Sequence, residues 1–395
     1  MKVALVCDWL TTIGGAESVL LALHEMYPDA PIYTSQYSEK GIDWFKDADI
    51  RTGWLQHFPV RFRKVLGPLR QRYFSHLDLS DYDLVISVTG AEAKSVRTTP
   101  KTRTKNHKTE QPEQAEHRCV HLCYCHVPTQ YYWGKYDEYL DNPGFGILNP
   151  LARIVLKLYI NPLRKKDFRA AKNPDQFITI SKYAADQIKK YYKRESVIIY
   201  PPVDLKKFST GLSTSREIKN GKSQINRTTN YITTSRQVNW KRIDICVKAC
   251  VKTGVNLTVI GDGPEHNNLL KIANGASNIT FLPTMTQDEL KKYLVQADAY
   301  LFPSCEPFGL APIEAMACGT PVIAYGKGGA LDYIQPKTNG LFFDKQTVSS
   351  LIEAMGKFKP DDYSPNVVKN TTLTFDKKIF KTKIKELVNE KVKLS

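Results

Sequence analysis

The chain has 395 residues, which exceeds the roughly 250 to 300 residues that one hydrophobic core usually organises, so we expect two domains. Hydrophobic residues make up 42% and charged residues 24% of the chain, a balance that excludes extensive disorder. The formal net charge of +16 favours an anionic partner: nucleic acid, an acidic membrane face or a phosphorylated ligand.

Cysteine usage and hydropathy indicate the compartment. Eight cysteines without a dense framework of spacings argue against a secreted disulfide scaffold and favour a reducing, cytoplasmic location. The apolar start MKVALVCDWL meets Asp8 early and has no small-residue cleavage site, so we expect a buried strand there and no signal peptide. No stretch approaches the roughly 20 apolar residues that span a bilayer, so we expect any membrane association to be peripheral, on the inner face.

Two basic stretches, Arg61 to Arg72 and Arg153 to Arg169, interleave Lys and Arg with apolar residues. This pattern is typical of a surface that meets an acidic membrane. Solvated faces of ordinary amphipathic helices are the alternative, and the sequence does not choose between them.

The first half alternates apolar runs with helical spacing. The run Lys2 to Val6 leads through the loop Thr11 to Ala16 into a predicted helix at Glu17 to Met26. Further predicted strands, each followed by a candidate helix, are Leu84 to Val88, Val120 to Tyr124 and Phe177 to Ile180. The alternation predicts a doubly wound α/β domain with a parallel sheet.

Polar segments indicate the domain boundaries. Residues 98–117 have no apolar periodicity and are predicted to form a mobile surface loop. The polar stretch Thr210 to Asn230 follows Tyr200-Pro201-Pro202-Val203, where we place the junction. We therefore expect one domain at 1–202, a second domain at 203–376, and a C-terminal helix at 377–395 that packs back across one of the two domains.

The second half repeats the alternation and predicts a second Rossmann-like domain. Its predicted strands are Tyr231 to Ser235, Leu257 to Ile260, Ile279 to Leu282, Ala299 to Phe302 and Pro321 to Ala324. Its predicted helices are Ile243 to Thr253, Leu269 to Ala273, Gln287 to Gln296 and Ala311 to Ala317. Two such domains facing each other leave an interdomain cleft, where the carboxyl ends of the strands bind ligands.

The strongest chemical signal is the segment Phe302 to Ala324, FPSCEPFGLAPIEAMACGTPVIA. A strand ends there, a loop carries Glu306 and Gly309, and a helix follows with Pro312 in its first turn. The free N–H groups and partial positive charge of a helix start favour a phosphate. Glu306 and Glu314 would repel that phosphate, so we expect them to accept hydrogen bonds from sugar and ribose hydroxyls. Read singly, either glutamate is also consistent with an ordinary helix.

A second signal is SRQVNWKR, directly after a predicted strand. Arg236 and Lys241 are spaced to reach a diphosphate at the strand end, the first as a fork and the second as a point charge. Their alternative is a solvated pair at a helix start, although cations at that end oppose the helix dipole.

Weaker signals come from a histidine and from three glycine or cysteine clusters. His126 follows a strand and is placed to hydrogen-bond a sugar hydroxyl. Cys119, His121, Cys123 and Cys125 share one face, but the C-x2-C pairing of zinc sites is absent and we expect no metal. The loop Gly14-Gly15-Ala16-Glu17 allows close approach to a ligand, whereas Gly261-Asp262-Gly263-Pro264 lacks the third glycine of a dinucleotide fingerprint.

With these segments in view, the chain resembles glycosyltransferase family 4, the retaining GT-B transferases, and within it the O-antigen mannosyltransferases. The resemblance spans nearly the whole chain, and Glu306 to Glu314 match the family's E-x7-E element. It rests on CDWLTTIGGAE, DAPIYT, LSDYDLVIS, CYCHVPTQYYW, ITISKYAADQIKKYY with IYPPVD, SRQVNWKRID, GDGPE and EPFGLAPIEAMACGTPVIAYGKGGALDYI.

The resemblance implies that residues 1–202 form the acceptor-side domain, that residues 203–376 bind the nucleotide sugar, and that the helix at 377–395 packs back on the N-terminal domain. It also implies a role for each matching residue. Arg236 and Lys241 would hold the donor diphosphate, Glu314 the ribose hydroxyls and Glu306 the transferred hexose. His126 would face the donor sugar. The implied catalytic residues are His126, Glu306, Arg236 and Lys241, and the implied donor-binding residues are Gly15, Arg236, Lys241, Glu306, Phe308, Gly309, Leu310 and Glu314.

The implied function is retaining transfer of a hexose, mannose from GDP-mannose, to a glycan or lipid-linked acceptor in cell-envelope polysaccharide synthesis, with neither metal nor cofactor. One alternative is a UDP-sugar donor. Another, from a different class, is a non-catalytic protein that binds sugar nucleotides or polyanions. Nucleic acid is disfavoured as a partner, because no nucleic-acid-binding module is recognisable.

Overall fold

The structure is a computed structural model that describes residues 1–60, 66–99, 118–141, 146, 149–208 and 229–393. Most of the predicted loop at 98–117 and most of the polar stretch at 210–230 lie outside the described residues, as do 61–65 of the first basic stretch. The chain divides into two compact units: residues 1–202 with 380–395 form unit 1, and residues 203–379 form unit 2.

Unit 1 contains a seven-stranded parallel sheet in the order β3-β2-β1-β4-β5-β6-β7. The strands are β1 (Val3–Cys7), β2 (Ile32–Thr34), β3 (Ile50–Arg51), β4 (Leu84–Thr89), β5 (Val120–Cys125), β6 (Gln176–Thr179) and β7 (Ser196–Ile198). Strands β1, β4 and β5 are buried along their whole length, as a parallel sheet covered on both faces requires. The predicted doubly wound domain is confirmed.

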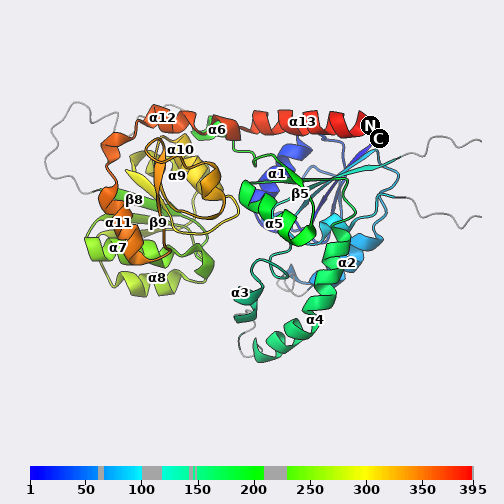
Figure 1. Ribbon diagram of the computed structural model, residues 1–395, viewed down its shortest axis with the longest axis horizontal. Helices are drawn as coiled ribbons and strands as arrows, with labels where there is room; N and C mark the ends of the chain where they lie inside the picture. Colours follow the sequence, from blue (N-terminus) through cyan, green and yellow to red (C-terminus); the bar gives the residue numbers. More distant parts are fainter. Residues whose placement is uncertain (61–65, 100–117, 142–145, 147–148, 209–228, 394–395) are drawn as a thin grey trace, which may run out of the picture. The chain divides into compact units, whose positions relative to one another are not determined.

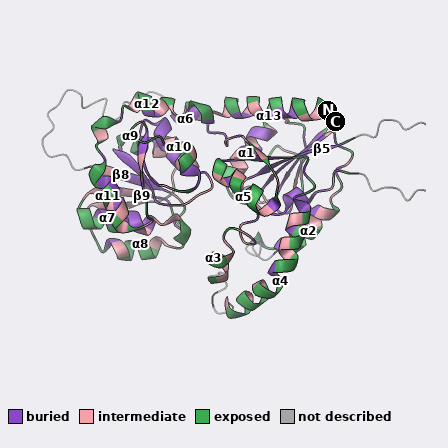
Figure 2. Cartoon of the chain, viewed as in Figure 1, coloured by how far each residue is buried: buried purple, intermediate pink, exposed green. Residues whose placement is uncertain are grey.

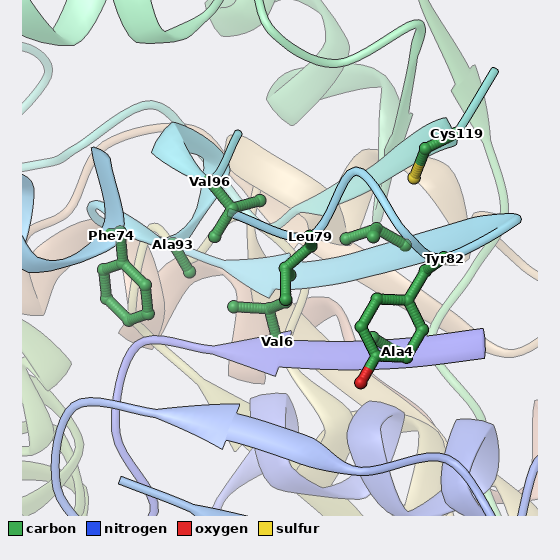
Figure 3. Packing of buried hydrophobic residues seen from close by; sticks show 9 residues of the cluster. Ala4, Val6, Phe74, Leu79, Tyr82, Ala93, Val96 and Cys119 are labelled. Atoms are coloured by element: carbon green, nitrogen blue, oxygen red, sulfur yellow. The ribbon is translucent and has the colours of Figure 1, made fainter. Parts of the chain in front are cut away.

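Unit 1 also contains helices, and Figure 1 shows some of them beside this sheet and others extending away from it. They are α1 (Gly15–His24), α2 (Gly67–His76), α3 (Tyr136–Asp141), α4 (Asn149–Ala170) and α5 (Lys182–Tyr192). Ser181 caps α5 by accepting a hydrogen bond from the Ala184 N–H, and the helix ends at Lys193 in the left-handed conformation. Figure 3 shows part of the core, in which Phe74 of α2 packs with Ala4 and Val6 of β1.

Unit 2 contains a six-stranded parallel sheet in the order β10-β9-β8-β11-β12-β13. The strands are β8 (Asn230–Thr234), β9 (Asn256–Ile260), β10 (Ile279–Leu282), β11 (Ala299–Phe302), β12 (Val322–Tyr325) and β13 (Gly340–Phe343). The helices are α6 (Leu205–Phe208), α7 (Ile243–Thr253), α8 (His266–Ala273), α9 (Gln287–Gln296), α10 (Leu310–Ala317), α11 (Val348–Lys357) and α12 (Pro365–Asn370). The second predicted Rossmann-like domain is also confirmed.

The last helix, α13 (Lys377–Lys393), starts in unit 2 and continues as part of unit 1. In unit 1 its Phe380 ring meets Tyr124 of β5 edge-on at 5.9 Å between centroids, and Lys381 pairs with Glu25 at 2.7 Å. Among the described residues, no helix is both long and apolar enough to cross a bilayer.

The sheet orders fix where ligands are expected. In each sheet the strand order reverses beside one strand: β1 lies between β2 and β4, and β8 lies between β9 and β11. In open α/β sheets, ligands bind at such a switch point, beyond the carboxyl ends of the strands. The loops that follow β1 and β4 in unit 1, and β8 and β11 in unit 2, are therefore the places to look for a site.

Candidate functional site

In unit 2, the two loops at the switch point carry the residues predicted to bind a donor. Strands β8 and β11 pair in parallel, so the loops that follow them leave the sheet at the same edge. The loop after β8 carries Arg236 and Lys241, and the loop after β11 carries Glu306 and leads into α10.

The structure brings Lys241 and Glu306 into direct contact. The Lys241 Nζ lies 2.5 Å from the Glu306 Oε1, and the two side chains are only 17% and 13% exposed. Glu306 Oε1 also accepts a hydrogen bond from the Ser304 hydroxyl at 2.7 Å, and the Lys241 ammonium lies over the Trp240 ring. The sequence predicted that these two residues hold different parts of one donor; the structure shows that they meet, 65 positions apart in the chain.

Arg236 is exposed, and its guanidinium makes no hydrogen bond or ion pair with any residue that the structure describes. The next residue fixes the loop. Gln237 is buried, its N–H donates to the Asp262 carbonyl at 2.7 Å, and its side-chain amide donates to the Gly261 carbonyl at 2.5 Å. The loop is therefore held while the cation beside it stays available to an anion.

The same contacts explain the Gly261-Asp262-Gly263 segment. Gly261 has φ +124, and a Cβ there would collide with the Ser235 carbonyl oxygen; a Cβ at Gly263 would collide with that of Gln237. These glycines let two loops pack backbone to backbone. Sequence reasoning rejected a dinucleotide fingerprint here but missed this supporting role, for which the paired glycines were the available signal.

Helix α10 begins at Leu310, two residues earlier than Pro312, and follows Gly309. Gly309 has φ +95, and an ideal Cβ would lie 2.6 Å from the Phe302 ring, so the position requires glycine. No described side chain caps this helix end. The N–H groups at the start of α10, which include that of Leu310, therefore remain a favourable place for an anion.

Phe308 fixes the position of the loop between β11 and α10. Its ring is 3% exposed and packs edge-on against Tyr333 and Phe375, with centroids at 5.5 and 5.8 Å. The Tyr333 hydroxyl donates to the Phe308 carbonyl at 2.9 Å. The ring thus belongs to the core of unit 2, and the contribution that we expect of Phe308 to donor binding is the placement of Gly309 and α10.

Glu314 lies on α10 in poorly hydrated surroundings. Burial raises the pKa of its carboxyl to about 7. Tyr300 is buried on β11, and its hydroxyl donates to the Thr234 carbonyl at 2.8 Å. Both glutamates influence the pKa of this hydroxyl. Burial first, and then Glu306 and Glu314, hold the pKa of the Tyr300 hydroxyl above its usual value. The two predicted acids therefore share one electrostatic neighbourhood.

Unit 1 has its own cavity, of about 300 Å³, at the carboxyl ends of β1, β4 and β5. Its lining includes Asp8 and Trp9 after β1, Ala16 and Glu17 of α1, Gly90 after β4, His126 after β5, and Tyr131. Gly15 directly precedes the lining residues of α1. No side chain among the described residues caps this helix start, which follows the extended Gly14.

His126 lies in the cavity wall. Its ring Nε2 is buried and has no hydrogen-bond partner among the described residues, while its backbone N–H donates to the Thr89 carbonyl at 2.9 Å. Burial lowers the pKa of the imidazole to about 4, so the ring is neutral at neutral pH. An unpartnered buried ring nitrogen beside a cavity is a ready hydrogen-bonding group for a ligand.

Asp8 is a positioning residue that sequence reasoning missed. Its buried carboxylate accepts hydrogen bonds from the Thr89 hydroxyl and from the N–H groups of Gly90, Glu92 and Ala93, at 2.8 to 3.0 Å. It ties the loop after β1 to the loop after β4 and so shapes the cavity. The signal was an acid directly after a wholly buried strand.

Two buried ion pairs support the same region. Arg70 pairs with Glu92 at 2.9 Å, and Lys94 pairs with Asp167 at 2.6 Å; all four side chains are at most 2% exposed. Arg70 lies in the basic stretch Arg61 to Arg72, and its burial removes it from any surface that could meet a membrane or solvent. This cation is buried because the Glu92 carboxylate inside the unit requires a partner.

The cysteine-bearing strand packs in the core. Cys119, Cys123 and Cys125 are buried, and the His121 Nε2 lies 2.8 Å from the Ser87 hydroxyl. Burial lowers the pKa of His121 to about 4. No group of three or more His, Cys, Asp or Glu residues in the described part of the chain is arranged to hold a metal ion.

The match to a protein family lies within unit 2. Residues 215–372 match the family described as glycosyl transferases group 1, a span that contains Arg236, Lys241, Glu306 and Glu314. The D-inositol 3-phosphate glycosyltransferase of Mycobacteroides abscessus is 29% identical over 197 residues, 46% of this chain and 44% of that protein. The GDP-mannose-dependent alpha-(1-6)-phosphatidylinositol monomannoside mannosyltransferase of Mycobacterium tuberculosis is 26% identical over 236 residues, 55% and 58% of the two chains.

The chain thus spans about half the length of the curated relatives it matches, whereas the similarity to solved structures covers nearly all of it. The Anabaena protein HepE in complex with UDP has a TM-score of 0.67 at 17% identity, over 99% of this chain and 100% of that one. Sucrose-phosphate synthase from Thermosynechococcus elongatus has a TM-score of 0.70 at 16% identity, over 100% of both chains. These comparisons give the whole chain the GT-B fold, and residues 215–372 match the family described as glycosyl transferases group 1.

Proposed function

We propose that the chain is a retaining glycosyltransferase that moves a hexose from a nucleoside diphosphate sugar to a glycan or lipid-linked acceptor. The observation that carries the proposal is the contact between Lys241 and Glu306, at the switch point of the sheet that matches the glycosyl transferases. In a sugar nucleotide the diphosphate is bonded directly to the hexose. A cation that binds the phosphate and an acid that binds a sugar hydroxyl are therefore expected next to each other.

We assign the diphosphate to Arg236, Lys241 and the amino end of α10. A guanidinium without a partner in the described chain, an ammonium whose present partner is a carboxylate, and a helix start without a side-chain cap are three features that favour a phosphate. Charge that develops on the departing diphosphate would be stabilised by these groups, so we expect transfer without a metal ion.

We assign the hydroxyl groups of the donor to the two glutamates. Glu314, whose pKa burial raises to about 7, is stabilised as a carboxylate by ligand donors, and we assign it the ribose hydroxyls. Glu306 receives the hexose. When the diphosphate engages Lys241, the carboxylate of Glu306 loses part of its partner's charge and accepts hydrogen bonds from the sugar in its place.

For the chemical step we prefer substitution on one face of the hexose. The bond from the anomeric carbon to the leaving phosphate oxygen breaks, the acceptor oxygen bonds to the same face, and the acceptor proton passes to the leaving phosphate. No residue is needed as a covalent nucleophile. In unit 1 we assign the cavity beside Gly15 to the acceptor side and the neutral His126 to a sugar hydroxyl.

We further propose GDP-mannose as the donor, in an O-antigen type of cell-envelope polysaccharide synthesis at the inner face of the cytoplasmic membrane. Curated relatives that are GDP-mannose-dependent support the donor. A UDP-sugar is the alternative, supported by the Anabaena structures with UDP and UDP-glucose.

The test is a panel of GDP- and UDP-sugars incubated with the full chain and a membrane lipid extract, in which the consumption of each sugar nucleotide is followed. We expect one donor to be consumed, and GDP or UDP but not an oligonucleotide to raise the melting temperature. Stabilisation by a nucleotide with no donor consumed would favour the non-catalytic sugar-nucleotide-binding alternative. Stabilisation by the oligonucleotide alone would contradict the proposal.

A further inference from the structure

Helix α4 leaves a continuous apolar surface uncovered. Five large hydrophobic side chains of its first half are between 47% and 69% exposed: Leu151, Ile154, Val155, Leu158 and Tyr159. Their spacing of three, four, seven and eight residues puts them on one face of the helix. Single exposed hydrophobic residues are common, but a contiguous stripe of this kind marks an interaction surface.

The same face changes character in the second half of the helix. Lys165 and Arg169 follow Leu158 by seven and eleven residues, intervals that return to nearly the same side of a helix, and Lys166 follows Tyr159 by seven. All three basic residues are exposed, and none forms an ion pair with another described residue. The face is therefore apolar near its start and cationic near its end, over about 27 Å at about 1.5 Å per residue.

The opposite face holds α4 in a fixed orientation. Asp167, the sole acidic residue of the helix, is buried and accepts hydrogen bonds from the Lys94 ammonium, the Trp133 indole and the Tyr192 hydroxyl at 2.6 to 2.7 Å. The Arg164 guanidinium donates to the Tyr132 carbonyl at 2.6 Å. Figure 2 shows the first half of α4 mostly exposed, whereas buried and half-buried residues alternate with exposed ones in its second half.

We infer that this exposed face of α4 docks on an anionic lipid bilayer. The apolar side chains would enter the boundary between headgroups and acyl chains, while Lys165, Lys166 and Arg169 would meet lipid phosphates. Charge complementarity favours an anionic bilayer as the partner, because this face of α4 has three cations and no acid. The inference rests on the proposed function for its purpose, access to a lipid-linked acceptor, but bilayer binding is measured without donor or acceptor.

The experiment is co-sedimentation of the full chain with vesicles of phosphatidylcholine alone or mixed with phosphatidylglycerol. We expect binding to the mixed vesicles, weakened about tenfold or more by Ile154→Ser with Leu158→Ser, because each buried methylene group contributes to insertion. Lys165→Glu with Lys166→Glu is expected to weaken binding to the anionic vesicles by about thirtyfold or more. Leu373→Ser, at a leucine that is 61% exposed in unit 2, and Lys271→Glu, at an exposed lysine of α8, are the matched controls and should change nothing.

Circular dichroism and the melting-temperature response to GDP and UDP are recorded for every variant, so that loss of vesicle binding is separated from loss of fold. Vesicle binding with no donor consumed would leave the inference standing and count against the proposed function alone. Equal binding of wild type and α4 variants would overturn the inference. A wild-type chain that ignores vesicles but forms a dimer abolished by Leu158→Ser would overturn it in favour of a second copy of the chain.

Discussion

Replacing Glu306 by Gln tests the paired roles of Lys241 and Glu306. The substitution keeps the size of the side chain and one hydrogen-bond acceptor but removes the charge that faces Lys241 at 2.5 Å. Both side chains are mostly buried, so solvent screening is modest, and a hydrogen bond to a charged group contributes about 1.5 to 3 kcal/mol. If that contribution is made to the transferred sugar, transfer slows by about 10- to 150-fold.

Nucleotide binding should respond differently. Glu306→Gln frees the Lys241 ammonium from its carboxylate, so we expect the affinity for GDP or UDP to stay the same or to rise. Lys241→Met should do the opposite and weaken the affinity for the diphosphate, because it removes the cation. Single-turnover rates report transfer, and calorimetric titration of the nucleoside diphosphate reports binding.

The matched control is Glu353→Gln. Glu353 also pairs with a lysine of unit 2, Lys357, at 2.6 Å, but both side chains are about 70% exposed, at 68% and 72%. An exposed pair of this kind is screened by solvent and contributes little to stability. We expect transfer and nucleotide affinity to remain at wild-type values in this variant. Transfer by Glu306→Gln within about twofold of wild type would refute the reasoning, since the lost contribution predicts at least about tenfold.

Three further predictions concern other parts of unit 2. Arg236→Met should weaken binding of a nucleoside diphosphate by about tenfold or more, because the Arg236 guanidinium contacts only phosphate in the proposed complex. Calorimetry should show that the weaker binding of the uncharged nucleoside hardly changes. Burial raises the pKa of Glu314 in the folded state to about 7, above the usual 4.5, so its contribution to stability is complete below about pH 4.5 and is lost as the pH rises through about 7. The melting temperature of Glu314→Gln should therefore rise relative to that of wild type between about pH 5 and about pH 8. A difference in melting temperature that does not change with pH would contradict this assignment. Gly309→Ala should lower the free energy of unfolding by more than about 1 kcal/mol because of its φ of +95 and the Phe302 ring at 2.6 Å, whereas Gly356→Ala, inside α11 with open space around its Cβ position, should be neutral or stabilising.

The wholly buried strands and several helices followed from the sequence, whereas the 22-residue α4 was noted only as a basic stretch. The run at Leu84 to Val88 is extended by one residue in β4 (Leu84–Thr89), and the helix predicted at Glu17 to Met26 is α1 (Gly15–His24). Short strands escaped prediction. Strands β2 and β3 have three and two residues, too few to show a period. β2 becomes a strand because β1 offers it an edge, and β3 because β2 does.

The candidate site could be foreseen as a set of residues but not as a set of contacts. A strand end followed by Arg236, or by Glu306 and a glycine, is visible in the sequence. The pairing of Lys241 with Glu306 depends on β8 and β11 being neighbours, and the burial of Arg70 depends on Glu92, 22 positions away. Such choices among partners are made by tertiary packing, which a linear pattern does not record.

The stereochemistry of the product tests the central claim most directly. Proton magnetic resonance of one reaction mixture, containing the full chain, the consumed donor and the acceptor, reports the anomeric configuration as the linkage forms. The account predicts that the product keeps the configuration of the donor and that Glu306→Gln slows its appearance without preventing nucleotide binding. An inverted product, or a folded protein that consumes no sugar nucleotide at all, would contradict the account.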